Sequence, residues 1–257
     1  MNRRKFIRDA GVSFVASLVA GVASSFQASQ AQTRGSVTIQ FLGHSAFLFT
    51  GDGRRILSNP FRPIGCTKGY RAPQVAADLV MISSRLLDEG ALDGIPGNPR
   101  LLAEPGIYQF RGMQVQGIRM DHDRVGGRRF GSNIAWRWNQ AGINFLHLGG
   151  AAAPITVEQR ILLGRPDVLM VPVGGGPKAY NAAEAKAAIE VLNPKIIIPT
   201  QFRTQAADPN ACDIQAVDEF LTVMQGTPVA RRGNTIALQP ADLPTQGARV
   251  ELMSYPF

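Results

Sequence analysis

The three histidines and two cysteines of this 257-residue chain set narrow limits on any metal chemistry. His122 stands between Asp121 and Asp123, and the adjacent carboxylates Asp88 and Glu89 lie earlier in the chain. A zinc centre takes at least three protein donors, and a dinuclear centre takes more. Asp88, Glu89 and His122 carry donor groups of this kind, and a set so rich in oxygen favours Mn or Mg over Zn.

Each of these candidates also has a structural interpretation. Asp88 is placed to cap a helical turn over Glu89–Leu92. His122 precedes a Gly-Gly turn, which suits a solvated loop imidazole with a raised tendency to protonate. An enzyme without metal would need a nucleophile and a base. Ser83 or Ser84 with His122 offers two members of a triad and leaves the third unassigned.

Arginines form a second group of candidates. Arg85 lies beside the adjacent carboxylates, two arginines follow the turn after His122, and another follows Gln201. Guanidinium groups recognise carboxylates and phosphates. If these four arginines face one cleft, they form a site for a small anionic molecule; solvated surface positions are the alternative. The residues of this hypothesis are His44, Arg85, Arg128, Arg129, Gln201 and Arg203.

The elements that must position these residues follow from hydrophobic patterning. Strands dominate the first half, and buried apolar strands alternate with helices in the second half, which indicates sheets covered by helices in one domain. Two helices have capping boxes, from Thr156 with Gln159 and from Asn181 with Glu184. A third helical repeat runs from Ile214 to Met224. The predicted strands are 36–42, 46–50, 55–57, 78–83, 106–110, 113–119, 133–138, 143–147, 167–172, 195–199 and 235–238.

The first 31 residues read as an export signal. A basic start with paired Arg3 and Arg4 precedes an uncharged apolar stretch and the small-x-small sequence Ser29-Gln30-Ala31. The pair is typical of twin-arginine (Tat) signals. We expect the mature protein in the periplasm or, in a cyanobacterium, the thylakoid lumen, with no stable membrane span after cleavage. An N-terminal membrane anchor is the alternative.

Charge and cysteine content add further limits. The formal net charge is +8, of which the first 31 residues contribute a net +3, and the remaining +5 is only mildly basic and does not predict a nucleic-acid partner. Cys66 and Cys212 either pair, as an oxidising compartment permits, or remain buried thiols. The two loops that carry them are expected at the edge of the same cleft.

Three stretches together resemble the metallo-β-lactamase-fold hydrolases, in particular their ascorbate-phosphate-lactonase-like branch. They are Phe41–Phe47, Asp167–Gly176 and Leu192–Pro199, and the resemblance extends from about Val37 to Phe202. It implies an α/β fold, an αββα sandwich with its site along one edge. Members of that family use a metal-held hydroxide, because a divalent ion lowers the pKa of bound water to about 7.

The chain departs from that family's ligand pattern at most positions. The family's His-x-His-x-Asp-His motif reads Ser-Arg-Leu-Leu-Asp-Glu at residues 84–89, where only Asp88 matches and the carboxylate after it can still donate. His122 stands at a ligand position, so the resemblance leaves Asp88, Glu89 and His122 as the candidates for a single-metal site. Gly150 stands where the family has a bridging carboxylate, and Gln201 where it has the last imidazole.

These departures predict a non-catalytic binding or assembly protein, a pseudoenzyme without a cofactor, whose partner is a small anionic molecule or another protein. The alternative is a divergent metal-dependent hydrolase of an ester, lactone or phosphoester, with an altered mononuclear site holding one Zn, Mn or Mg ion. In either case the expected organisation is a signal peptide over residues 1–31 and a single metallo-β-lactamase-fold domain over residues 32–257.

Overall fold

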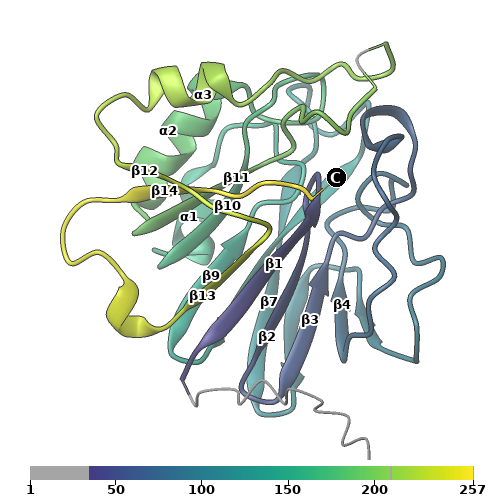
Figure 1. Ribbon diagram of the computed structural model, residues 1–257, viewed down its shortest axis with the longest axis vertical. Helices are drawn as coiled ribbons and strands as arrows, with labels where there is room; N and C mark the ends of the chain where they lie inside the picture. The colour runs from purple at the N-terminus through teal and green to yellow at the C-terminus, as the bar shows by residue number, and fades with distance from the viewer. Residues whose placement is uncertain (1–34, 209, 257) are drawn as a thin grey trace, which may run out of the picture. The chain divides into compact units, whose positions relative to one another are not determined.

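The computed structural model describes residues 35–208 and 210–256, and the expected export signal over residues 1–31 lies outside the described residues. Two β-sheets face each other, and helices cover the outer face of one of them (Figure 1). The six-stranded sheet has the order β13-β1-β2-β3-β4-β5, and the eight-stranded sheet has the order β12-β14-β11-β10-β9-β8-β7-β6. This is the single-domain α/β sandwich that the sequence predicts.

Along the chain strands come first, and strands alternate with helices in the second half, as expected. In the six-stranded sheet the strands are β1 Val37–Gly43, β2 Ala46–Gly51, β3 Arg54–Ser58, β4 Leu79–Met81, β5 Arg100–Leu102 and β13 Thr235–Leu238. In the eight-stranded sheet they are β6 Gly106–Phe110, β7 Met113–Asp121, β8 Ser132–Gln140, β9 Ile143–His147, β10 Val168–Pro172, β11 Ile196–Thr200, β12 Val229–Arg231 and β14 Arg249–Leu252. The helices are α1 Val157–Leu163, α2 Ala182–Leu192 and α3 Asp218–Val223, with 3-10 turns η1 Gly65–Thr67 and η2 Pro240–Asp242.

Burial explains why these segments form these elements. β1 alternates buried and half-buried side chains, as a strand with one covered face requires. Every residue of β10 and of β11 is buried, because the facing sheet covers one side and α2 covers the other. The main core lies between the sheets, where Phe47, Phe49 and Trp138 pack together.

The two outer faces are covered differently. Apolar residues of α2 and α3 pack on the eight-stranded sheet, and both α1 and α2 begin with the predicted capping boxes. On the six-stranded sheet a smaller cluster around Leu57 and Val80 is covered by coil residues that include Val75 and Ile95. In the described part of the chain, the second helical layer is therefore replaced by loops.

Most of the predicted strands are confirmed, and the differences are local. The expected helix over 214–224 begins only at Asp218. No helical turn forms after Asp88, so this residue is not a helix cap. Among the residues that the structure describes, no helix is both long and apolar enough to cross a membrane.

Strand direction brings the candidate residues to one edge. β9, β10 and β11 are parallel, as are β3, β4 and β5, so the carboxyl ends of each set lie together. The hydrogen bond from the Ile134 backbone N–H to the Ser83 carbonyl oxygen joins the sheets at that edge. His44 lies in the β1–β2 turn at this edge. The other residues of the site follow the carboxyl ends of β4, β7, β9, β10 and β11; they are Asp88, Glu89, His122, Gly150, Lys178 and Gln201.

Candidate functional site

Glu89 is the centre of the site and is fully buried. Its Oε1 accepts hydrogen bonds from Ser84 Oγ at 2.5 Å and from His122 Nε2, and its Oε2 accepts one from Gln201 Nε2 at 2.9 Å. Burial alone would raise the pKa of Glu89, but the charge of His122 and the bonds from His122 and Ser84 outweigh it and lower the pKa to about 2. The carboxylate is therefore ionised, and donors surround it.

His122 is buried against this carboxylate. The sequence suggests a solvated loop imidazole, and that expectation is wrong because the side chain has no exposed surface. Burial alone would lower the pKa of His122, but the charge of Glu89 and the hydrogen bond to it raise the pKa instead. Nδ1 of His122 is buried without a hydrogen-bond partner among the described residues.

Asp123 builds the turn that presents His122. Its Oδ1 accepts the backbone N–H groups of Val125 and Gly127, and its Oδ2 accepts those of Arg129 and Phe130. Desolvation opposes ionisation, but these four bonds lower the pKa of Asp123 to about 2. The carboxylate next to His122 therefore organises the loop and is not a donor to the site.

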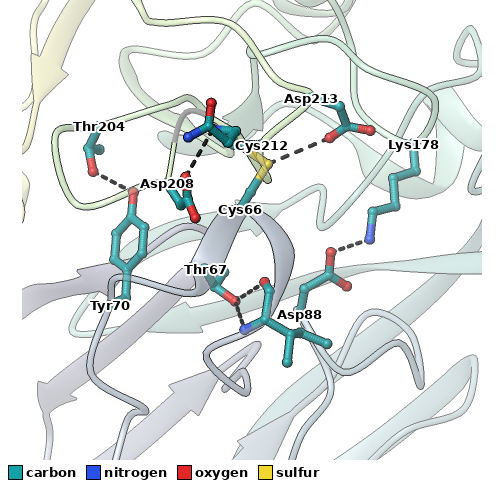
Figure 2. Close-up of a disulfide and its surroundings, with 11 residues drawn as sticks. Cys66, Thr67, Tyr70, Asp88, Lys178, Thr204, Asp208, Cys212 and Asp213 are labelled. Carbon is teal, nitrogen blue, oxygen red and sulfur yellow. Dashed lines mark hydrogen bonds and ion pairs between the residues drawn. A yellow bond between two sulfur atoms is a disulfide. The ribbon is translucent and has the colours of Figure 1, made fainter.

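Asp88 lies beside Glu89 but faces a different partner. Its carboxylate forms an ion pair with Lys178 Nζ, which comes from the loop after β10 (Figure 2). Both side chains are largely buried, with 17% and 24% of their surface exposed. Sequence reasoning missed Lys178; the signal was a lone cation two residues after the Gly174–Gly176 turn at the carboxyl end of a buried strand.

His44 and Gln201 hold the two sheets together at the site. The backbone N–H of Gln201 donates to the His44 carbonyl oxygen at 3.0 Å. Both residues have a positive φ, 55° and 48°, as does Asn59 at 47°. Left-handed backbone in a residue with a side chain is costly and is typical of functional sites.

A pocket of about 430 Å³ opens above this network. His44, Asp88, Lys178 and Gln201 line it, and Nε2 of His44 and Oε1 of Gln201 are buried there without a hydrogen-bond partner among the described residues. Burial lowers the pKa of His44 even though Asp88 and Glu89 act to raise it. The residues that line the pocket thus include a neutral imidazole, an ammonium group and an amide.

The disulfide of Cys66 and Cys212 forms part of the pocket wall. It joins η1 to the loop before α3, and Lys178 and Asp88 line the same pocket (Figure 2). This settles the two alternatives that the sequence leaves open for the cysteines. The expectation that both lie at the edge of one cleft is confirmed, because both line the pocket.

The arginines are not brought together around this pocket. Arg85 is exposed and pairs with Glu104, and Arg128 Nε donates to a backbone oxygen of its own loop. Arg129 lies over the Phe130 ring, with Cζ 4.9 Å from the ring centroid. Arg203 lines a separate cavity of about 610 Å³. In the described part of the chain, the cation that lines the pocket is Lys178.

The third histidine and the serine candidate Ser84 have structural partners. His147 Nε2 donates to the Ser45 carbonyl oxygen at 2.9 Å, and its Nδ1 accepts the Gly149 N–H. Burial lowers the pKa of His147 to about 4. Ser84 donates to Glu89 and not to an imidazole, so the described residues contain no serine–histidine pair here.

Comparison with known proteins identifies the class. The β-lactamase superfamily domain matches residues 38–201, and the chain belongs to this superfamily, the metallo-β-lactamase-fold hydrolases. A UPF0173 metal-dependent hydrolase of Thermococcus onnurineus is 25% identical, over 67% of this chain and 89% of that protein.

Two solved structures extend the comparison. A protein of Thermotoga maritima described as a candidate Zn-dependent hydrolase of the metallo-β-lactamase superfamily is 30% identical, with a TM-score of 0.69, over 86% of this chain and 100% of that one. A metallo hydrolase of Ignicoccus hospitalis shares the fold, with 18% identity and a TM-score of 0.54, over 85% of this chain and 95% of that one.

The residues present do not fit the metal that this superfamily implies. No cluster of three or more imidazole, thiolate or carboxylate groups that could hold a metal ion occurs among the described residues. Glu89 and His122 bond to each other, and Asp88 bonds to Lys178. The predicted metal set of Asp88, Glu89 and His122 is thus brought to one edge of the sandwich but is divided between two ion pairs.

Proposed function

We propose that this protein is a divergent hydrolase of the metallo-β-lactamase superfamily that cleaves an ester, lactone or phosphoester in the pocket above Glu89. Superfamily membership and the metal-dependent hydrolases among its relatives favour a hydrolase over a non-catalytic protein. The observation that carries the proposal is the unpartnered Nε2 of His44, which is buried in the wall of an open pocket.

His44 can act as the base in this reaction. Because burial lowers the pKa of His44, the imidazole is neutral near pH 7 and can take a proton. For an ester, Nε2 accepts a proton from water as the water oxygen bonds to the carbonyl carbon. The bond to the leaving alkoxide then breaks, and the imidazolium returns its proton to that oxygen.

Lys178 and Asp88 supply the electrostatic part of the step. The ammonium group lines the same pocket as His44, so it can donate to the oxyanion that develops on the carbonyl. Asp88 holds this ammonium in place through their ion pair. Gln201 Oε1 is free to accept a hydrogen bond from a substrate hydroxyl or amide group.

The test is hydrolysis of chromogenic ester, lactone and phosphoester substrates by the purified chain. We expect His44→Ala to lower kcat/KM by about 100-fold or more, because a positioned base contributes on that scale. Arg85→Ala is the control, since Arg85 is exposed and does not line the pocket. Equal loss in both variants would count against the role of His44.

Parallel assays in chelator and in added Zn, Mn or Mg test the mononuclear alternative. Activity that chelator abolishes and one of these ions restores would assign the step to a metal-held water. Activity that is the same in both buffers would assign it to the chain's own residues.

A second candidate function is a non-catalytic binding or assembly protein, as the sequence first suggests. The contact between Glu89 and His122 favours this second function, because the two candidate metal ligands form a hydrogen bond with each other. No hydrolysis of any substrate class, together with saturable binding of a small anion or a protein partner in the pocket, would support this candidate.

Export by the Tat route to the periplasm also remains a proposal. It rests on the Arg3-Arg4 pair and the apolar stretch after it. Cell fractionation with mass spectrometry of the mature chain tests it, and the expected N-terminus is Gln32.

A further inference from the structure

The position of a superfamily metal centre is filled here by a closed set of hydrogen bonds. Three different side chains donate to the buried Glu89 carboxylate: the Ser84 hydroxyl, the His122 imidazole and the Gln201 amide. A metal ligand must offer a free lone pair, and donors occupy three of the about four lone-pair sites of the Glu89 carboxylate. Breaking this set to admit an ion would leave buried donors unpaired.

Gly150 makes the set possible through its lack of a side chain. A Cβ built there would lie 2.4 Å from His122 Cε1 and 2.8 Å from Glu89 Oε2, closer than atoms approach. The Gly150 N–H is fixed by a 2.9 Å bond to Asn133 Oδ1, so the backbone is held against the pair. A bridging carboxylate at this position has no room while Glu89 and His122 are in contact.

The second carboxylate is neutralised as well. Asp88 is next to Glu89 in the chain, and its charge is matched by Lys178, which is anchored in the pocket wall. A divalent ion would have to displace a protein ammonium group from a largely buried pair to reach Asp88. Asp88 and Glu89 therefore each have a protein partner.

We infer that protein donors and a protein cation have replaced the metal centre in this chain: the Ser84–Glu89–His122–Gln201 network and the Asp88–Lys178 pair hold the sheet edge in place of a divalent ion. The inference concerns how the site is held together and needs no catalytic activity. A negative hydrolysis assay would end the proposed function and leave this inference standing.

The experiment compares the metal content and thermal stability of the full chain with those of Glu89→Gln. The protein is made without an affinity tag, in medium containing Zn and Mn, and purified without chelator. We expect far less than one metal ion per chain by mass spectrometry, and the same Tm in chelator and in added Zn or Mn. One ion per chain, with a Tm that falls when chelator removes it, would overturn the inference.

The Glu89→Gln variant distinguishes the two roles that Glu89 could have, the centre of a hydrogen-bond network or a metal ligand. If Glu89 holds a network, the variant lowers Tm by about 5 to 10 °C, equally in chelator and in added metal. If Glu89 is a metal ligand, the loss appears only in added metal, and the inference fails. An unchanged Tm in both buffers would also overturn it.

Ser84→Ala keeps the test decisive if Glu89→Gln does not fold. It removes one donor to Glu89 and leaves the carboxylate intact. We expect a smaller fall in Tm, of about 2 to 4 °C, that again does not depend on metal. A fall that added Zn or Mn reverses would show that the carboxylate serves a metal after all.

Discussion

Two small features decide the chemistry available at the residue scale: the missing side chain of Gly150 and the amide of Gln201. The amide directs an N–H at Glu89, where the related hydrolases are expected to direct an imidazole lone pair. Gly150 allows the Glu89–His122 contact. The substitutions can be seen in the sequence, but their effect cannot, because it depends on the contact between side chains 33 positions apart.

Gly150→Ala tests how tightly this contact is enclosed. The added Cβ would meet His122 and Glu89, so we expect the free energy of unfolding to fall by about 1–3 kcal/mol, as for other overpacked sites. Gly233→Ala is the matched control, since a Cβ there has no atom within 4 Å and neither glycine has a positive φ. Urea unfolding of both variants measures the difference, and equal losses would refute the prediction.

The Glu89–His122 pair also predicts a pH dependence. Because the pKa of Glu89 is lowered, its carboxylate stabilises the fold at pH values above the ordinary carboxyl pKa of about 4.3. This stabilisation is lost as the pH falls toward 2. Because the pKa of His122 is raised, its imidazolium stabilises the fold at pH values below about 6.5. This stabilisation is lost as the pH rises through the pKa of His122 in the folded state. The pair therefore contributes most between about pH 4.5 and 6.5.

His122→Gln isolates this contribution. The stability gap between wild type and variant, from urea unfolding, should be larger at about pH 5.5 than at about pH 8.5. The comparison with wild type is needed because His44 and His147, whose pKa values are lowered, destabilise the fold as the solution becomes acidic. A gap that does not change with pH would contradict the assignment of an ion pair.

At the scale of elements, patterning predicts every long strand and misses some of the short ones. β1, β2, β7 to β11 and the capped helices α1 and α2 follow from periodicity and caps. β5, β12 and β14 have three or four residues each and are missed, although β4 and β13 are as short and are predicted. The helix predicted from Ile214 begins only at Asp218, because backbone groups of Gln215 bond to Gly174 and Arg203 in the site loops.

The N-terminal capping box of α2 tests whether a motif read from the sequence stabilises the fold. The Asn181 side chain accepts the Glu184 N–H, and the Glu184 side chain accepts the Asn181 N–H. Asn181→Ala should lower the free energy of unfolding by about 1 kcal/mol. Glu190→Ala, on the exposed side of the same helix, should change it by less than about 0.5 kcal/mol. Chemical denaturation of the two variants distinguishes a cap effect from a general effect of alanine.

At the scale of the whole molecule, the superfamily fold is present although the described residues contain no cluster that could hold a metal ion. The superfamily sandwich is held by the core between its sheets and by the core under its helices, and neither needs a metal. The Cys66–Cys212 disulfide adds a covalent link across 146 positions of the chain. Sequence reasoning reached this architecture through combined motifs but could not decide the state of the cysteines, because pairing depends on how two distant loops meet.

Replacing both cysteines by serine measures how much the disulfide contributes to the free energy of unfolding. We expect the double variant to lose about 2–4 kcal/mol of unfolding free energy, because a long closed loop limits the unfolded chain. A thiol reductant should bring the wild type to the same stability and leave the variant unchanged. If the reductant affects both proteins equally, the link is not responsible.

The close approach at Gly150 also bears on how a metal site could be built here by substitution. An aspartate at position 150, by itself, would drive atoms into the Glu89–His122 contact. A histidine at position 201, by itself, would remove the amide donor to Glu89. Each of these substitutions is therefore disfavoured on its own. We expect a metal site of the superfamily's kind to require several coordinated changes in this chain.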